Sequence, residues 1–312
     1  MRTIQQPLFT PETEWVMPEE LKDLKGTKEI AVDLETNDPD LKELGSGNVI
    51  GRGHIAGIAV AVEGWSGYFP IHHEQGGNMD KKLVLDWLQD LFNQEYTTFI
   101  FHNAMYDVCW LRNAGIKIKG KIVDTMIAAS LIDENRLSYQ LNTLAKHYVG
   151  IGKDEKVLYN AAKEYGLDPK KELWRLPAMF VGQYAERDAE ATLKLWQRLH
   201  RELYDQELID IFTLETQLFP CLVEMRFKGV RVDLEKAQKI KTNLMAREQK
   251  ILNKIKDLTG LHVEIMAARS IAKAFDKLKL PYDRTAKSNE PSFTKNFLQN
   301  HPHELAQSIA DA

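Results

Sequence analysis

The chain has 312 residues, of which 44% are hydrophobic and 28% are charged, and its formal net charge is −4 at pH 7. This length exceeds the usual size of a single domain, so we expect one large domain and a smaller one. The N-terminus lacks the apolar stretch of a signal peptide, and no apolar run is long enough to span a bilayer. Cys109 and Cys221 fit no disulfide framework or zinc motif, which indicates buried thiols in a reducing compartment such as the cytoplasm.

Apolar runs and helical periodicities alternate through the first part of the chain and predict an α/β sheet with helices packed on it. The predicted strands are 28–35, 54–63, 65–71, 97–103 and 118–123. The predicted helices are 79–93, 104–114, 124–133, 139–149 and a long one that starts near Pro177 and continues to residue 203. The first three strands should form an antiparallel meander, because Gly64 marks a turn between the second and the third. A loop is expected over 37–53, and a polar stretch with helical fragments over 150–176.

From about residue 206 onward the pattern is helical alone. A helix is expected over 207–228, and Pro220 should kink it. Asp233 is a good N-cap for a further helix that reaches Leu258 and is followed by Gly260. Short helices joined by turns should fill 262–312. The expected organisation is a lead-in over 1–26, an α/β domain over 27–205 and a helical segment over 206–312.

Two acids on one predicted strand are the first candidate site residues. Asp33 and Glu35 lie in VDLET at 32–36, and alternate side chains of a strand share a face. Two carboxylates on an apolar strand repel each other and lose hydration unless something neutralises them. A hard divalent cation such as Mg²⁺ does this well. Taken alone, the pair is also explained by a strand that emerges into solvent.

Two helices supply further acids. Asp107 follows the start of the predicted helix over 104–114 and is surrounded by apolar residues, although an acid favoured by the helix dipole would look the same. On the long helix, Tyr184 and Asp188 are four residues apart and therefore share one face. The neighbouring charges, Glu186, Arg187 and Glu190, are expected to be solvated. An ordinary tyrosine at the rim of the core would also explain Tyr184.

Taken together, the order of these motifs resembles the tyrosine-bearing (DEDDy) branch of the DEDD 3′→5′ exonuclease superfamily, over about residues 27–205. The resemblance implies a ribonuclease H-like mixed sheet flanked by helices. It also implies two Mg²⁺ ions, for which Mn²⁺ can substitute, held by Asp33, Glu35, Asp107 and Asp188. Tyr184 would orient the attacking water. Thr36 and Asn103 lie inside the motifs and are expected to touch the terminal nucleotide, whereas His102 is expected to be structural.

The second half of the chain resembles the start of the thumb region in bacteriophage-type family A DNA polymerases. LETQLFPCLVEMRFKGVRVD at 214–233 has the apolar helix and the turn from Gly229 to Asp233, with Glu224 and Met225 in reversed order. The stretches 270–302 and 123–150 also look like these polymerases. A helical appendage packed on the exonuclease domain is the alternative. The chain ends before the palm and fingers, so we expect no polymerase activity from it.

The basic segment 226–257 has ten Lys/Arg against four Asp/Glu, which leaves a net charge of −10 for the rest of the chain. Charge alone favours a solvated helix face. Beside the polymerase resemblance, contact with the DNA backbone is the better explanation, through Lys236, Lys239 and Lys250. The expected partners are a single-stranded or frayed 3′ DNA end and the missing polymerase portion or other replication proteins, in the cytoplasm of a bacterium or a phage-infected cell and without a membrane.

The alternatives share the same residues. An RNA-trimming exonuclease of the same superfamily would carry the same acids. A DNA-binding remnant with an inert exonuclease fold would be expected to lack at least one acid, and this chain lacks none. The nine histidines form no nucleophile–base spacing, and no Gly-rich phosphate loop indicates an ATP-driven function.

Overall fold

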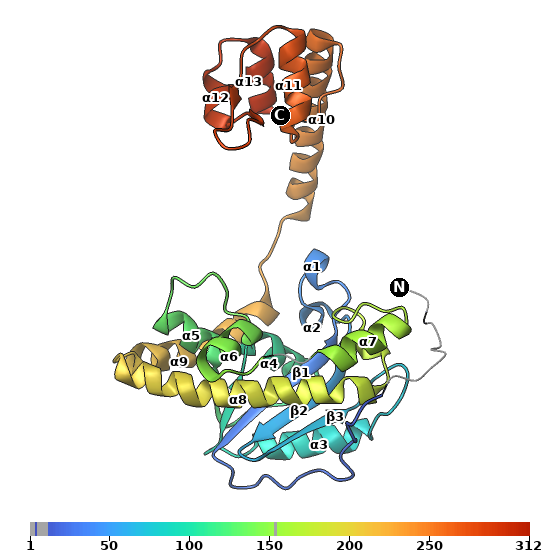
Figure 1. The fold of residues 1–312 in the computed structure, drawn as a ribbon, viewed down its shortest axis with the longest axis vertical. Coiled ribbons are helices and arrows are strands. Elements are labelled where there is room, and N and C mark those ends of the chain that lie inside the picture. Colours follow the sequence, from blue (N-terminus) through green and yellow to red (C-terminus); the bar gives the residue numbers. More distant parts are fainter. Residues whose placement is uncertain (1–3, 5–11, 153–154) are drawn as a thin grey trace. The chain divides into compact units, whose positions relative to one another are not determined.

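The computed structural model of the protein describes residue 4, residues 12–152 and residues 155–312. The predicted lead-in over 1–26 and the polar stretch over 150–176 therefore lie in part outside the described residues. The chain forms two compact units, Met1–Gly229 and Val230–Ala312, which we describe separately (Figure 1). Of the helices described, none is long and apolar enough to cross a membrane.

The first unit is built on a five-stranded mixed sheet with the strand order β3-β2-β1-β4-β5. The strands are β1 (Glu29–Asn37), β2 (His54–Val62), β3 (Trp65–Pro70), β4 (Thr98–Phe101) and β5 (Lys121–Asp124). The pairs β1–β2 and β2–β3 are antiparallel, which confirms the predicted meander. The pairs β1–β4 and β4–β5 are parallel, so β1, β4 and β5 end at the same edge of the sheet.

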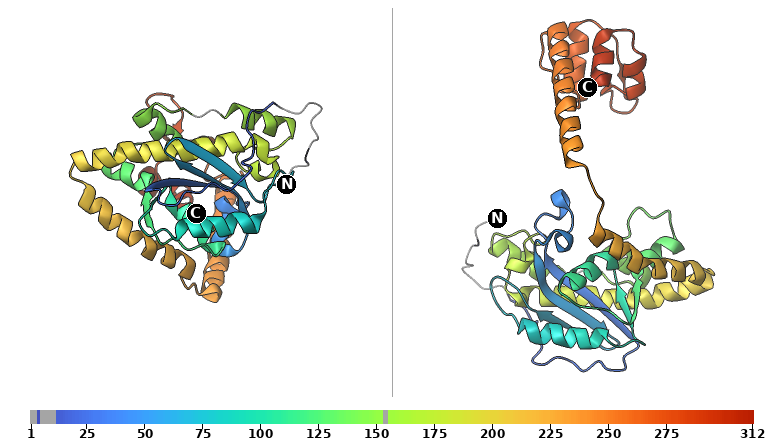
Figure 2. Two further views of the ribbon diagram at one scale, coloured as in Figure 1. Left: turned by 90° about the horizontal axis from the view of Figure 1, so that it is seen from below. Right: turned by 180° about the vertical axis from the view of Figure 1, so that it is seen from behind.

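Helices cover both faces of this sheet (Figures 1 and 2). On one face α8 (Gly182–Asp205) packs with α5 (Thr125–Ile132), α6 (Leu141–Val149) and α7 (Lys156–Glu164), in a core that includes Ala31, Ala59 and Tyr68. On the other face α3 (Lys81–Phe92) and α4 (Ala104–Asn113) pack in a core that includes Ile30, Val32 and Leu34. The alternation along β1 therefore separates two cores, and Asp33 shares the face on which α8 lies.

The predicted elements differ from the observed ones in several places. The expected loop over 37–53 contains two four-residue helices, α1 (Leu41–Leu44) and α2 (Gly47–Ile50), and the short helices η1 (Leu173–Arg175) and η2 (Ala178–Phe180) precede α8. Cys109 is buried, but Cys221 is exposed, so the expectation of two buried thiols is wrong for Cys221. Cys221 lies on α9 (Ile209–Lys228), which contains Pro220 and packs against α4, α5 and β5. Because α9 packs in this way, the first unit reaches Gly229, beyond the boundary expected near residue 205.

The second unit contains α10 (Leu234–Thr259), α11 (Ala268–Lys277), α12 (Lys295–Asn300), α13 (Glu304–Asp311) and the short strands β6 (Asp283–Arg284) and β7 (Pro291–Ser292). Asp233 caps α10, because its carboxylate accepts a hydrogen bond from the Lys236 amide, as predicted. Gly260 ends the helix with a φ of 65°. Phe275 lies at the centre of this unit's core. The first half of α10 is exposed on all sides, apolar residues included.

Candidate active site

Asp33 and Glu35 lie near the end of β1 on the face that α8 covers, and both are half-buried. Their partners on β2 are small: Asp33 pairs with Ala59 and Glu35 pairs with Gly57. The register shifts between Glu35 and Thr36, so the strand is irregular immediately after the second acid. Small partners and an irregular strand end leave room in front of both carboxylates.

Tyr184 and Asp188 come from the first two turns of α8 and share one face of that helix, as predicted. Burial raises the pKa of Tyr184 well above its usual value, and the nearby charges of Glu35, Asp188 and Asp33 raise it further, as does a hydrogen bond with Asp188. These interactions place the tyrosine hydroxyl among three of the predicted acids. Asp188 is only 7% exposed.

Asp107 reaches the same place from the other side of the sheet. β1 pairs with β4 only as far as Ala31. Beyond Ala31, the backbone of β1 on this side is not paired with β4 and is open to other hydrogen bonds. There the Leu34 amide donates a hydrogen bond to Asp107 Oδ1 at 3.1 Å. Asp107 is only 4% exposed. Burial raises its pKa well above the usual range, and the negative charge of Asp33 adds to this, although the bond from Leu34 acts in the opposite direction.

The site therefore gathers carboxylates that repel one another in a partly dry environment. Such a set has the chemistry of a Mg²⁺ or Mn²⁺ site, because hard divalent cations prefer carboxylate oxygens and neutralise their surplus negative charge. Within the described ranges, no three acidic, histidine or cysteine side chains are already arranged as ligands around one point. The donor set nevertheless fits a divalent cation in its chemistry.

Asp124, at the end of β5, was not identified from the sequence. Its carboxylate is 6% exposed and accepts hydrogen bonds from the amides of Asn103 (3.0 Å), Ala104 (2.7 Å) and Met126 (2.8 Å). It thereby fixes the start of α4, where Asn103 has a left-handed φ of 64°, and it caps α5. Burial raises the pKa of Asp124 despite these bonds. Asp124 is thus a positioning residue for Asn103 and Asp107.

The remaining predicted residues of this unit are Thr36, Asn103 and His102. Asn103 is exposed at the start of α4. Thr36 Oγ1 lies 2.6 Å from the Tyr106 hydroxyl, which also donates to Asp38 at 3.2 Å. Sequence reasoning missed Tyr106, although it directly precedes Asp107. His102 Nδ1 hydrogen-bonds with the Thr125 hydroxyl at 2.8 Å, which fits the structural role expected for it.

Two acids on α8, which the sequence led us to expect in solvent, are half-buried and hydrogen-bonded. Glu186 accepts hydrogen bonds from Trp15 Nε1 at 2.8 Å and from the Tyr68 amide at 2.9 Å. Burial raises the pKa of Glu186, although these two hydrogen bonds act in the opposite direction. Glu190 accepts from the Ser66 hydroxyl at 2.6 Å. The bonds from the Tyr68 amide and the Ser66 hydroxyl tie the outer strand β3 to α8, because an edge strand has backbone groups that no further strand pairs with.

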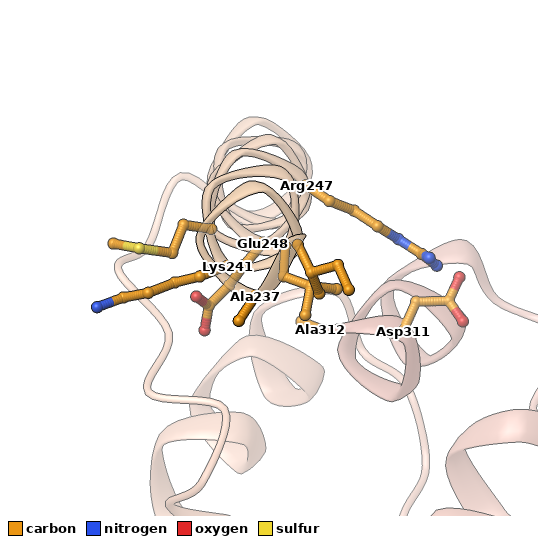
Figure 3. A pocket seen from close by; sticks show the side chains of 9 residues that line it. Ala237, Lys241, Arg247, Glu248, Asp311 and Ala312 are labelled. Carbon is orange, nitrogen blue, oxygen red and sulfur yellow. The ribbon is translucent and has the colours of Figure 1, made fainter. Parts of the chain in front are cut away.

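Lys236, Lys239 and Lys250 lie on α10 of the second unit, and all three are exposed. Beside them α10 and the end of α13 form a shallow hollow of about 730 Å³, lined in part by Ile240 and Leu244. Figure 3 shows the side chain of Arg247 extending toward Asp311 at one end of this hollow. The three lysines lie on the helix that was predicted after Asp233. Their contact with a nucleic acid stays a prediction.

A family model described as 3'-5' exonuclease matches residues 9–204. The DNA-directed DNA polymerase of Pseudomonas phage M6 is 35% identical over 324 aligned positions, which cover 100% of this chain and 48% of the phage protein. DNA polymerase I of Pseudomonas aeruginosa is 26% identical, over 87% of this chain and 29% of its own length. The POL domain of Pol1 from M. smegmatis, solved with DNA primer-template and dNTP, shares the fold with a TM-score of 0.62 at 16% identity, over 91% of this chain and 44% of that one. The chain spans about half the length of the phage relative and a smaller share of the other two proteins.

Proposed function

The chain belongs to the 3′→5′ exonuclease family of the family A DNA polymerases, and on this premise we propose that it removes nucleotides from the 3′ end of DNA by metal-dependent hydrolysis of phosphodiester bonds. The proposed reaction uses two divalent cations, Mg²⁺ or Mn²⁺, and its biological purpose is proofreading. Asp33, Glu35, Asp107 and Asp188 are the proposed metal ligands, and Tyr184 is the proposed residue that orients water.

One observation carries this proposal. Three separate parts of the first unit bring their acids to one place: β1 supplies Asp33 and Glu35, α4 supplies Asp107, and α8 supplies Asp188. The repulsion of Asp33 raises the pKa of Asp107, and the charges of Glu35, Asp188 and Asp33 raise that of Tyr184. Folding brings these like charges together at a cost in free energy. A site that binds cations and an anionic phosphodiester accounts for that cost.

The side chains have distinct tasks in this scheme. When bound, a pair of cations would stabilise the negative charge on the attacking and leaving oxygens of an in-line displacement. The Tyr184 hydroxyl keeps its proton at neutral pH, because the ordinary pKa of a tyrosine is about 10 and burial raises it further here. It can therefore donate one hydrogen bond and accept another, which suits the orientation of a water molecule toward phosphorus. Asp124 holds the start of α4, so that Asp107 and Asn103 keep their places.

DNA is the proposed substrate because the relatives reported above are DNA polymerases. The exposed lysines of α10 would bind the phosphate backbone of that DNA. Within the cell, the cytoplasm of a bacterium or phage-infected host is the proposed location, and the polymerase portion that relatives carry is the proposed partner. An RNA-trimming exonuclease remains the second candidate, because the same carboxylates would serve it.

The central experiment digests single-stranded DNA that is labelled at either its 3′ or its 5′ end, with Mg²⁺ or with EDTA. We expect immediate release of the 3′ label, a ladder of shortened 5′-labelled products, and no reaction in EDTA. Asp33→Ala should lose both hydrolysis and Mn²⁺ binding measured by calorimetry. The matched control is Glu95→Ala, an exposed acid between α3 and β4. An unchanged rate for Asp33→Ala would refute the assignment.

A parallel digestion separates the two substrate classes. Labelled DNA and RNA of the same sequence are compared at the same concentrations. We expect a higher kcat/KM for DNA. A clear preference for RNA would favour the trimming enzyme and would leave the assignment of the metal site intact.

A further inference from the structure

A groove of about 580 Å³ is lined in part by Thr36 and Tyr106, which adjoin the proposed metal ligands Glu35 and Asp107 in the sequence. Its lining also includes Lys42 of α1 and residues of the segment 168–175, which contains η1. The groove thus joins residues next to the carboxylates to a part of the chain that none of the sequence motifs includes.

The segment 168–175 is held rigidly at the groove. Asp168 Oδ1 accepts hydrogen bonds from the amides of Lys170 (2.9 Å) and Lys171 (3.0 Å). Glu172 Oε2 accepts a bond from the Asp168 amide at 3.0 Å, which closes the turn. Arg175 is 6% exposed and forms ion pairs with Glu74 and Glu172, at 2.6 and 2.9 Å. These contacts fix the backbone from which the lysine side chains extend.

Trp174 forms an aromatic wall of this groove. Its ring is half-buried and meets the His54 ring edge-on, with centroids 5.3 Å apart, and His54 in turn stacks on His72. His54 pairs with Asn37 on β1, two residues beyond Glu35. The indole therefore rests against His54, which lies on β2 beside the strand that carries Asp33 and Glu35. A supported indole at a groove is suited to stacking on a nucleobase.

The charges of the groove favour an anion near Lys170 and Lys171. Four acids also line it, Asp38, Glu43, Asp168 and Glu172. Asp38 accepts from the Gly47 amide and from Tyr106, while Asp168 and Glu172 are engaged in the turn and with Arg175. Among the described residues, no ion pair with an acid is formed by Lys42, Lys170 or Lys171, all of which are exposed. The charges of the lining balance in number, and the three lysines are its cations that remain available to an anion from outside.

We propose that the segment 168–175 is a binding track for the nucleotides that precede the 3′ end of a single strand. Lys170 and Lys171 contact backbone phosphates, and a base stacks on Trp174. The proposal rests on the proposed exonuclease function and extends it, because it assigns a path by which the strand reaches the carboxylates. Neither base stacking nor phosphate contact reads a sequence, so the track tolerates any strand.

The test compares oligothymidylates of three and twelve nucleotides as substrates. For the longer one, Trp174→Leu should raise KM roughly 5- to 100-fold, the effect of losing one stacked base. The double variant Lys170→Ala/Lys171→Ala should lower the slope of log affinity against log salt by about 1.4, since each phosphate contact on a single strand contributes about 0.7. Both losses should grow with oligonucleotide length, and Trp174→Phe should recover part of the first.

The matched control is Lys119→Ala/Lys121→Ala, which removes two exposed lysines, one just before the edge strand β5 and one at its first residue. Thermal unfolding shows whether each variant is folded. If the Trp174 and Lys170/Lys171 variants have the same KM and the same salt slope as this control with both oligonucleotides, the proposed track is wrong. If the wild type has no nuclease activity, the proposed function fails. Anisotropy of labelled twelve-nucleotide thymidylate in EDTA then tests the track by itself, and equal affinities of wild type and variants would overturn it.

Discussion

Replacing Asp124 by alanine removes the carboxylate that fixes the start of α4. The Ala104 amide is fully buried, and it loses its acceptor at 2.7 Å. A buried donor without a partner costs about 1–3 kcal/mol. Loss of the cap on α5 costs about 1 kcal/mol more. The exposed Asn103 amide can bind water instead, and removal of a poorly solvated carboxylate returns part of the sum of about 2–4 kcal/mol, so we expect a net destabilisation of about 1–3 kcal/mol.

Activity should fall as well, because Asp107 lies one turn further along the same helix. A displacement of about 1 Å at a catalytic group can cost on the order of 100-fold in rate. We expect the loss mainly in kcat. Asp124→Asn keeps one oxygen acceptor and should lose about half as much stability.

Urea unfolding measures the first effect, through the midpoint at a constant m-value, and digestion of 3′-labelled DNA measures the second. Asp90→Ala, at an exposed acid on α3, is the control and should stay within about 0.5 kcal/mol of the wild type. An Asp124→Ala protein that matches this control in both measurements would show that the hydrogen bonds to α4 do not position Asp107.

Three further predictions concern other parts of the molecule. Tyr184→Phe should lower kcat about 10- to 100-fold, the value of one hydrogen bond to a charged group, and should leave calorimetric Mn²⁺ binding intact; equal loss of metal binding would contradict its role toward water. Burial lowers the pKa of His73 to about 4, so this residue is neutral in the folded protein and protonated in the unfolded chain between that pH and about 6.5. Its contribution to stability is therefore present at pH 7 and falls by about 2 kcal/mol on acidification to pH 4.5; His73→Gln should lose less over the same interval, and equal losses would exclude His73 as the cause. Neutralising Lys236, Lys239 and Lys250 together should weaken DNA binding and lower its salt slope by about 2–3, measured by anisotropy; binding indifferent to salt and to these changes would exclude phosphate contact by α10.

Much of the first unit could be predicted because its signals are periodic. The alternation in β1 placed Asp33 and Glu35 on one face, and the spacing of four placed Tyr184 beside Asp188; the structure shows both arrangements. The ribonuclease H-like mixed sheet is confirmed by its strand order and by the polymerase of similar fold. The roles of these residues in hydrolysis stay predictions.

What could not be predicted depends on contacts between distant segments. Asp124 looks in the sequence like any acid at the start of a helix, and only the fold shows that it also holds α4. Glu186 was expected to be solvated because its partners, Trp15 and Tyr68, are more than a hundred residues away. The helices α1 and α2 span a single turn each, too short for a periodicity to appear.

Gly57, opposite Glu35 on β2, has a consequence for the kinds of mutation that would inactivate the site. A Cβ at this position would lie 2.2 Å from the Tyr68 hydroxyl, which hydrogen-bonds with His73 at 2.7 Å, and His73 bonds the Leu176 carbonyl at 2.9 Å. Any side chain at Gly57 would therefore displace Tyr68, and with it the hydrogen bonds through His73 to Leu176. A random screen for loss of nuclease activity should return Gly57 variants in which every carboxylate is intact. The positions at which a mutation inactivates this site are accordingly more numerous than the residues that contact the substrate.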